Sequence, residues 1–299
     1  MSEWLTDLKQ LNIGKIETDA SLKKFTTYKV GGKARCVIYP KNTEKLVKLM
    51  KFIRSRNIKY KMLGNGSNLI FSDDLFDGIL IKLTEFDNIE IINNKIKVGA
   101  GYSLIKLSRI ALKNSLTGLE FAAGIPGTVG GAIFMNAGAY KSDISSIVEK
   151  VLVFRKGHFD WLSKEEMEFS YRHSILQDHP HWMAIACVLK LEEKNSEEIF
   201  ALMNERLKRR KNSQPLERLS AGSVFRNPEG SFAWKYIDEL GYRGYRQGDI
   251  EVSDKHPNFI VNCGEGKAED FLDIVYKIQE EVLSAYGVKL VMEVEKFNC

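Results

Sequence analysis

Three residues that lie far apart in the 299-residue chain carry side chains suited to chemistry: Arg172, Ser223 and Glu293. The guanidinium of Arg172 is a planar fork of donors that can bind a carboxylate or a phosphate. Ser223 stands among small residues that leave its hydroxyl accessible, so it could donate a proton. Each residue also has a simpler interpretation. A surface loop would explain Arg172, and a turn would explain Ser223, since its neighbours are turn formers.

Glu293 lies in the last apolar run of the chain. Alternation over residues 290–295 predicts a strand that places Glu293 opposite the face of Leu290, Met292 and Val294. A partly buried carboxylate there would have a raised pKa or would need an arginine partner. A glutamate at the rim of an edge strand explains the same pattern equally well.

A segment without charged residues, 121–140, contains five glycines and Pro126. Its length alone would suit a membrane span. Its apolar residues are interrupted, however, and glycine and proline disfavour a helix. A buried loop fits better, because glycines let the main chain approach a ligand and present N–H groups to a phosphate. A tightly packed turn without a ligand remains an alternative of equal weight.

A second glycine-rich turn, at residues 63–68, follows a predicted strand and leads into another apolar run. Gly64 and Gly66 can adopt positive φ, and Ser67 and Asn68 add donors. Because no helix clearly follows, the pattern disfavours a Rossmann fingerprint. A plain hairpin turn would explain this segment alone, but two such loops in one region favour a large cofactor that bears phosphate.

Composition indicates an ordinary globular protein, with 44% hydrophobic and 28% charged residues. The charged start, MSEWLTDLKQ, lacks an export signal, and the four scattered cysteines suggest reduced thiols in a cytoplasm. The net charge of +5 suits an anionic small molecule. The basic run at 206–211 predicts a solvated helix end, because it lacks the interleaved aromatics of a nucleic-acid surface. His179-Pro-His181 lacks a third metal ligand.

Short β-rich runs alternate with a few helices, which is typical of an α+β or mixed α/β fold. Residues 163–166 resemble a helix capping box. The expected strands are 34–39, 60–63, 79–83, a hairpin around Asn93-Asn94, 147–154 and 183–191. The expected helices are one capped by Asn42, 103–114, one capped by Asn195, a short one between Ser231 and Gly241, and an amphipathic one over 268–286 that stops at Gly287.

Seven motifs in chain order resemble the UDP-N-acetylenolpyruvoylglucosamine reductase (UDP-N-acetylmuramate dehydrogenase) family. They are TTYKVGG from Thr26, LGNGSNLIFSD from Leu63, LEFAAGIPGTVGGAIFMNAGAY from Leu119, SYRHS from Ser170, AGSVFRNP from Ala221, VSDKHPNFIVN from Val252 and MEV from Met292. Any one motif is weak, whereas all seven in order are highly specific and span nearly the whole chain.

The resemblance implies an α+β chain with an FAD-binding fold of the vanillyl-alcohol-oxidase (PCMH) type. It implies an FAD-binding subdomain from residues 1–62 with 289–299, a second from 63–196, and an α+β substrate-binding domain from 197–288. The short span from Arg172 to Ser223 is similar to the family type that lacks a tyrosine loop. The implied FAD-binding residues are Tyr28, Val30, Gly31, Gly32, Leu63, Gly64, Asn65, Gly66, Ser67, Asn68, Glu120, Ala123, Gly124, Pro126, Gly127, Thr128, Gly130, Gly131, Asn136, Gly138 and Ala139.

The resemblance also implies a reaction of peptidoglycan precursor synthesis. NADPH reduces FAD, and flavin N5 then passes hydride to C3 of UDP-N-acetylglucosamine enolpyruvate, giving UDP-N-acetylmuramate. Arg172 matches the arginine that polarises the substrate carboxylate, Ser223 the serine that delivers a proton to C2, and Glu293 a glutamate that acts protonated or through shared hydrogen bonds. Substrate-binding matches are Tyr171, Arg226, Asn227 and His256, with Lys211 the nearest candidate for the diphosphate despite the departing sequence KNSQP.

The resulting expectation is a monomeric cytoplasmic flavoenzyme whose partners are NADPH and the enolpyruvyl sugar, with no nucleic acid and no membrane. Another flavin oxidoreductase of the same fold, such as an alcohol or sugar oxidase, would not need Arg172, Ser223 and Glu293 together. A protein that binds RNA through residues 205–211 would be colourless, and its binding would depend strongly on salt.

Overall fold

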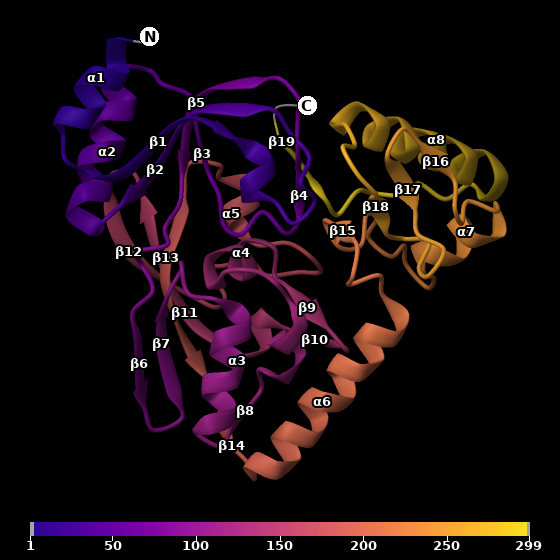
Figure 1. The fold of residues 1–299 in the computed structure, drawn as a ribbon. Helices are drawn as coiled ribbons and strands as arrows, with labels where there is room; N and C mark the ends of the chain where they lie inside the picture. The colour runs from indigo at the N-terminus through magenta and orange to yellow at the C-terminus, as the bar shows by residue number, and fades with distance from the viewer. Residues whose placement is uncertain (1–2, 298–299) are drawn as a thin grey trace. The chain divides into compact units, whose positions relative to one another are not determined.

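A computed structural model describes residues 3–297, in which the chain forms two compact units (Figure 1). The first unit contains Met1–Thr18, Cys36–Gly64 and Asp77–Lys208, and the second contains Asp19–Arg35, Asn65–Phe76 and Arg209–Cys299. The chain therefore passes between the units several times. The division into two FAD-binding subdomains and a substrate domain stays a prediction.

Most of a four-stranded sheet, with α1 and α2 beside it, forms one part of the first unit (Figure 1). The end of its strand β1 and the starts of its strands β2 and β5 are assigned to the second unit. Helix α2 begins after Asn42, whose side chain accepts from the Lys45 N–H, and it buries Leu46 and Met50. This confirms the predicted strand, capped helix and strand, and β5 lies between the two strands. The elements are β1 (Gly14–Ser21), β2 (Lys33–Pro40), β5 (Leu75–Ile81) and β3 (Tyr60–Met62) in sheet order, with α1 (Glu3–Gln10) and α2 (Thr43–Ser55).

A five-stranded antiparallel sheet forms the rest of the first unit and shares a core with α3 and α4. The predicted helix at 103–114 is confirmed, because Ser103 accepts from Lys106 N–H at its start and Asn114 ends it. The sheet order is β12 (His158–Ser163), β11 (Val148–Arg155), β13 (Met183–Lys190), β7 (Lys95–Gly99) and β6 (Ile89–Ile92). The other helices of the unit are α3 (Leu104–Lys113), α4 (Val129–Phe134) and α5 (Ile175–Asp178), with the 3-10 helices η2 (Glu120–Gly124) and η3 (Ile144–Ser146). Two short strand pairs complete it: β8 (Leu116–Thr117) with β14 (Glu192–Glu193), and β9 (Gly138–Ala139) with β10 (Ser142–Asp143). Helix α6 (Ser196–Ser213) begins in the first unit and ends in the second.

The second unit is organised around α8, whose apolar face packs on a small antiparallel sheet and on α7 (Figure 1). The residues that the amphipathic pattern predicts to face inward are all buried: Phe271, Ile274, Val275, Ile278 and Val282. Gly287 ends the helix at φ 67°. The elements are β15 (Leu219–Ser220), β18 (Ile260–Asn262), β17 (Ile250–Val252) and β16 (Arg246–Gln247) in sheet order, α7 (Ala233–Glu239), α8 (Ala268–Tyr286), η1 (Leu22–Phe25), and β4 (Leu69–Phe71) paired in parallel with β19 (Glu295–Phe297).

One predicted element differs from the structure, and one confirmed local motif is not followed by a helix. The last strand begins at Glu295, because the preceding residues bond to an irregular loop: Arg226 N–H donates to Val291 O, and Phe225 forms an isolated bridge with Met292. Ser163 and Glu166 do exchange the two bonds of a capping box, but only a turn follows them. Local hydrogen bonding alone was therefore insufficient to start a helix there.

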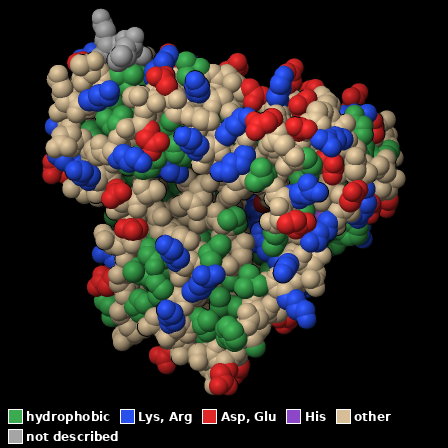
Figure 2. All heavy atoms as spheres, in the orientation of Figure 1, with side chains coloured by type: hydrophobic (Ala, Val, Ile, Leu, Met, Phe, Trp, Pro, Cys, Tyr) green, Lys and Arg blue, Asp and Glu red, His purple; other side chains and the backbone are tan. Residues whose placement is uncertain are grey.

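The net charge of +5 is not concentrated in a single patch on the face drawn in Figure 2. Basic and acidic side chains are intermixed on the face drawn in Figure 2. Within residues 3–297, no helix is both long enough and apolar enough to cross a bilayer. Cys36, Cys187 and Cys263 are free thiols, and Cys299 lies outside the described residues.

Replacing Gly287 tests how the end of α8 contributes to stability. A Cβ at this position would meet no atom within 4 Å, so the change isolates the cost of left-handed backbone. We expect Gly287→Ala to lower the free energy of unfolding by about 1 kcal/mol, and Gly287→Asn to lower it by less, because asparagine tolerates this conformation. Chemical denaturation followed by circular dichroism measures both, and equal stability of Gly287→Ala and wild type would contradict the expectation.

Candidate functional site

Arg172 is the third residue of a tight turn in the first unit. Ser170 and His173 exchange both main-chain hydrogen bonds at 3.1 Å, and Arg172 has φ 57°. An arginine in this backbone conformation is uncommon and is often found at functional positions. Its Nη2 donates to Gly138 O at 2.8 Å, and its guanidinium lies 5.1 Å from the ring centroid of Tyr171. The guanidinium is therefore held beside the glycine-rich segment rather than extended into solvent.

Asn136 links this turn to the glycine-rich segment. Its side chain is buried, donating to Ser170 O at 2.8 Å and accepting from Ser145 N–H at 3.1 Å. Ser174 Oγ also donates to Phe134 O at the end of α4. The backbone around Arg172 is thus anchored to α4 and to the residues after it.

The segment 121–140 forms η2, α4 and β9 instead of a single extended loop. Most N–H groups at its centre bond within the chain: Val129 donates to Tyr102 O, Gly130 to Ala100 O, and Gly131 to Thr128 Oγ1, while Thr128 caps α4. A Cβ on Gly130 would lie 2.9 Å from that of Ala100. Close packing therefore explains several of these glycines, and their predicted contacts with FAD stay a prediction.

Other predicted cofactor residues of the first unit occupy structural positions nearby. Glu120 is buried, and its carboxylate accepts from Thr117 Oγ1 at 2.5 Å and from Gly118 N–H at 3.0 Å. Leu63 is buried and donates its N–H to Ile81 O. The rest lie as follows: Ala123 and Gly124 in η2, Pro126 and Gly127 between η2 and α4, Gly138 and Ala139 in β9, and Gly64 directly after Leu63.

The second glycine-rich turn supplies donors suited to a phosphate. Gly66 has φ 63°, and a Cβ there would collide with the Phe25 carbonyl, so only glycine fits. The main-chain N–H groups of Gly66, Ser67 and Asn68 donate to no acceptor in the described part of the chain. Successive N–H groups in such a turn form an anion-binding nest. The turn therefore fits the diphosphate of FAD, and Asn65 is exposed beside it.

The main chain of Glu293 is held from two sides within the second unit. Its N–H donates to Val224 O at 2.8 Å, and its carbonyl accepts from Asn68 Nδ2 at 3.0 Å. Val224 directly follows Ser223. The structure thus brings the backbone segments of Ser223, Glu293 and the 66–68 turn together, whereas Arg172 belongs to the other unit. The meeting of all three predicted catalytic side chains stays a prediction.

Asn258 fixes the loop that carries Ser223, and sequence reasoning did not single it out. It is buried; its Oδ1 accepts from Phe225 N–H at 2.9 Å, and its Nδ2 donates to Phe225 O at 2.8 Å. Its carbonyl also accepts from Val224 N–H. A side-chain amide that replaces a backbone partner leaves no periodic signal in a sequence. The only signal for Asn258 was its position after His256-Pro257 and before an apolar run.

Tyr28 and its neighbours form part of the core of the second unit. The ring of Tyr28 packs edge-on against Phe271 with centroids 5.3 Å apart, and its buried hydroxyl has no hydrogen-bond partner among the described residues. Burial raises the pKa of this phenol well above its ordinary value, so it stays protonated. Val30 is buried beside it, and Gly31 and Gly32 lead back to β2.

The predicted substrate-binding residues lie in four settings. Arg226 has a buried Nε without a partner in the described chain, and Asn227 Oδ1 accepts from Ala233 N–H at the start of α7. His256 Nδ1 accepts from Asn258 N–H, and burial lowers the pKa of its imidazole. Lys211 is exposed near the end of α6. Tyr171, in the first unit, is 52% exposed, which would suit a ligand contact.

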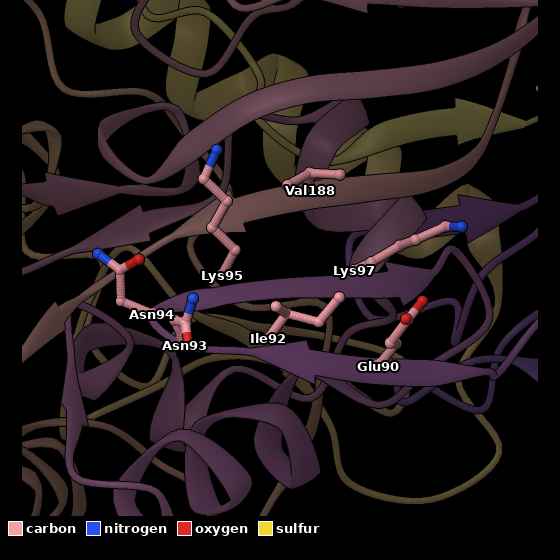
Figure 3. Close-up of a pocket in the computed structure, with 7 residues that line it drawn as sticks. All are labelled: Glu90, Ile92, Asn93, Asn94, Lys95, Lys97 and Val188. Carbon is pink, nitrogen blue, oxygen red and sulfur yellow. The ribbon is translucent and has the colours of Figure 1, made fainter.

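A surface hollow lies away from all these residues. It has a volume of about 270 Å³ and lies at the β6–β7 hairpin beside β13 (Figure 3). Its lining comprises Glu90, Ile92, Asn93, Asn94, Lys95, Lys97 and Val188. No predicted site residue is among them, so this hollow is not the candidate site.

Comparison with known proteins identifies the class first. Residues 34–158 match the family described as FAD binding domain. An alkyldihydroxyacetonephosphate synthase of 15% identity shares the fold over 64% of this chain and 44% of its own, with a TM-score of 0.50. The chain is an FAD-dependent oxidoreductase with the PCMH-type fold, as the resemblance to the reductase family predicts.

Residues 214–297 match the C-terminal domain of UDP-N-acetylenolpyruvoylglucosamine reductase. Reductases of that name from Anoxybacillus flavithermus and Bacillus subtilis are 42% and 38% identical over 297 residues, covering 99% of this chain and 98% of each relative. The crystal structure of the enzyme (MurB) from Thermus caldophilus covers 95% of this chain and 99% of its own, with 38% identity and a TM-score of 0.82. The chain belongs to the UDP-N-acetylenolpyruvoylglucosamine reductase family, so the predicted family is confirmed.

The lowered pKa of His256 predicts a pH dependence of stability. As pH falls below about 6.5, the unfolded imidazole takes up a proton more readily than the folded one, so stability present above that pH is lost. We expect wild type to lose more stability than His256→Gln between pH 7 and pH 5. Denaturant titration at both pH values measures the difference. Parallel losses in the two proteins would show that His256 does not titrate this way.

Proposed function

We propose that this enzyme catalyses the NADPH-dependent reduction of UDP-N-acetylglucosamine enolpyruvate to UDP-N-acetylmuramate. The bonding of Glu293 is the observation that carries the proposal. Its N–H donates to the carbonyl of Val224, the residue after Ser223, and its own carbonyl accepts from the Asn68 side chain in the proposed phosphate-binding turn. The proposed proton donor, the proposed acid and the proposed cofactor turn are therefore fixed to one another through the main chain.

The chemical difficulty is that an electron-rich enol ether must accept a hydride at C3. FAD, when bound, supplies the hydride chemistry, and the protein supplies orientation and charge. We assign Arg172 to the substrate carboxylate, because charge must move into that group as the hydride arrives. The fixed turn and the contact with Gly138 restrict the guanidinium to few positions, which supports a directional role.

Completing the reduction requires a proton at C2, and we assign its delivery to Ser223. Ser223 stands in a loop held by Asn258, and the residue is partly exposed, which supports this assignment. A serine is a weak acid, so it needs a strongly basic carbon and a relay of hydrogen bonds. Glu293, whose backbone lies beside Val224, would act protonated or through shared hydrogen bonds in that relay.

The remaining substrate contacts are assigned to Arg226, Asn227, His256, Tyr171 and Lys211. The unsatisfied buried donor of Arg226 supports its assignment, because such a group gains most from an anionic partner. We further propose that FAD is held by the cofactor residues inferred from the sequence, and that the enzyme acts as a cytoplasmic monomer.

Anaerobic spectroscopy tests the function directly. Purified protein should be yellow, NADPH should bleach its flavin absorbance faster than NADH does, and the enolpyruvyl sugar should restore it. Reoxidation by dioxygen but not by the sugar would instead indicate an oxidase of the same fold. Salt-dependent nucleic-acid binding by a colourless protein would favour the non-enzymatic alternative.

Ser223→Ala separates the two half-reactions. Flavin reduction by NADPH should stay nearly normal, whereas sugar-dependent reoxidation should slow by about 100-fold or more, because the proton donor is lost. Stopped-flow absorbance measures both rates, and Ser55→Ala, at an exposed hydroxyl in α2, serves as the control. Equal slowing of both halves would refute the assignment of the proton donor.

Arg172→Lys keeps the positive charge but removes the planar fork. We expect kcat for sugar reduction to fall by about 100-fold, since a point charge cannot replace paired, directed donors. Arg109→Lys, at an exposed position of α3, is the matched control. Steady-state kinetics with circular dichroism of both variants makes the comparison, and near-normal turnover would remove Arg172 from the catalytic residues.

A further inference from the structure

Lys82 is a buried lysine that contacts the start of the phosphate-binding turn. It directly follows β5, its N–H donates to Ile38 O on β2, and only 8% of the residue is exposed. Its Nζ donates to the carbonyl oxygen of Gly64. Lysine is seldom buried to this extent, because removing an ammonium from water is costly. A buried lysine bonded to a loop carbonyl therefore indicates a function for that loop.

The bond fixes the orientation of a whole peptide group. The chain has no cis peptide within its described residues, so the Gly64 carbonyl and the Asn65 N–H point in opposite directions across one plane. With the carbonyl directed at Lys82, the Asn65 N–H is directed away from it. A positive charge on the oxygen side also polarises the peptide and makes its N–H a stronger donor.

Gly64 is held from another side as well. A Cβ at Gly64 would lie 2.8 Å from Oγ1 of Thr128, the residue that caps α4. The peptide is therefore confined by close packing and by the lysine together. The next N–H groups along the chain are those of Gly66, Ser67 and Asn68, which have no acceptor in the described chain.

We propose that Lys82 is a positioning residue for the FAD diphosphate, which acts by fixing and polarising the Gly64–Asn65 peptide at the start of the 64–68 turn. The inference rests on the proposed role of this turn in holding the diphosphate. Lys82 acts through the peptide and is not itself assigned a contact with the cofactor.

The charge of Lys82 can be titrated under mild conditions. Burial lowers the pKa of its ammonium to about 8, and Glu17 on β1 opposes this effect. Glu17 is in turn paired with Lys15 at 2.8 Å and accepts from Tyr39 Oη on β2 at 3.0 Å. Lys82 is therefore charged below pH 8 and neutral above it, and the polarisation of the peptide should decline as pH rises through 8.

The test is the dissociation constant of FAD from the holoenzyme, measured by the gain of flavin fluorescence on dilution between pH 6.5 and 9. Lys82→Met removes the charge and the donor while keeping the apolar stem, and Lys61→Met, at an exposed position of β3, is the control. We expect Lys82→Met to raise the dissociation constant about tenfold at pH 7, as for loss of a charged hydrogen bond, and Lys61→Met to leave it within twofold.

The pH profile distinguishes positioning from simple structural support. The wild-type constant should rise with a midpoint near pH 8 toward that of Lys82→Met, which should itself stay flat. A flat wild-type profile, an unchanged constant in Lys82→Met, or a loss of thermal stability without a change in affinity would overturn the inference. If Lys82→Met does not fold, the wild-type profile alone decides. A second variant tests the proposed role of the turn separately. If Ser67→Pro binds FAD with unchanged affinity, the turn does not hold the diphosphate.

Discussion

The arrangement of the loops in the second unit depends on the hydrogen bonds made by the irregular segment before β19. Residues before β19 do not continue a ladder; they exchange hydrogen bonds with the Ser223 loop and with Asn68. A regular strand would satisfy its groups with one neighbour, whereas this segment divides them between two loops. Because each bond joins backbone or a short amide side chain, little rotational freedom remains. These bonds hold the Ser223 loop, the segment of Glu293 and the turn at Asn68 next to one another, although the three are distant in sequence and no long strand joins them.

Glycine has two separate uses in the glycine-rich regions. At Gly66 the left-handed backbone and the nearby Phe25 carbonyl exclude any side chain, and the N–H groups that follow have no acceptor among residues 3–297. At Gly130 the N–H is already bonded, and the missing Cβ permits close contact with Ala100. The first use presents donors to a ligand, and the second builds the support. Similar composition thus served different physical purposes in the two loops.

Much of the fold could be predicted because its signals are local. Asn42 and Ser103 cap helices through their own side chains, and Gly287 ends α8 through its own backbone. The start of the last strand could not be predicted. The alternation at 290–295 indicates which side chains are buried, but the hydrogen-bond partners of these residues lie near residue 225, which the alternation does not reveal. The capping box at Ser163 shows the opposite case: its predicted local bonds are present, but the residues that follow take up a turn.

The motifs single out the candidate residues of the site, whose roles stay predictions, but they do not single out the residues that hold the loops carrying them. Arg172, Ser223 and Glu293 stand out by type, whereas Asn258 and Lys82 act by replacing backbone partners or by orienting a peptide, which no periodicity records. Both supporting residues are buried and bonded to main-chain atoms, so they can hold the loops that are proposed to face a ligand. The residues proposed to react can therefore stand on loops, because Asn258 holds the loop of Ser223 and Lys82 is bonded to the carbonyl of Gly64.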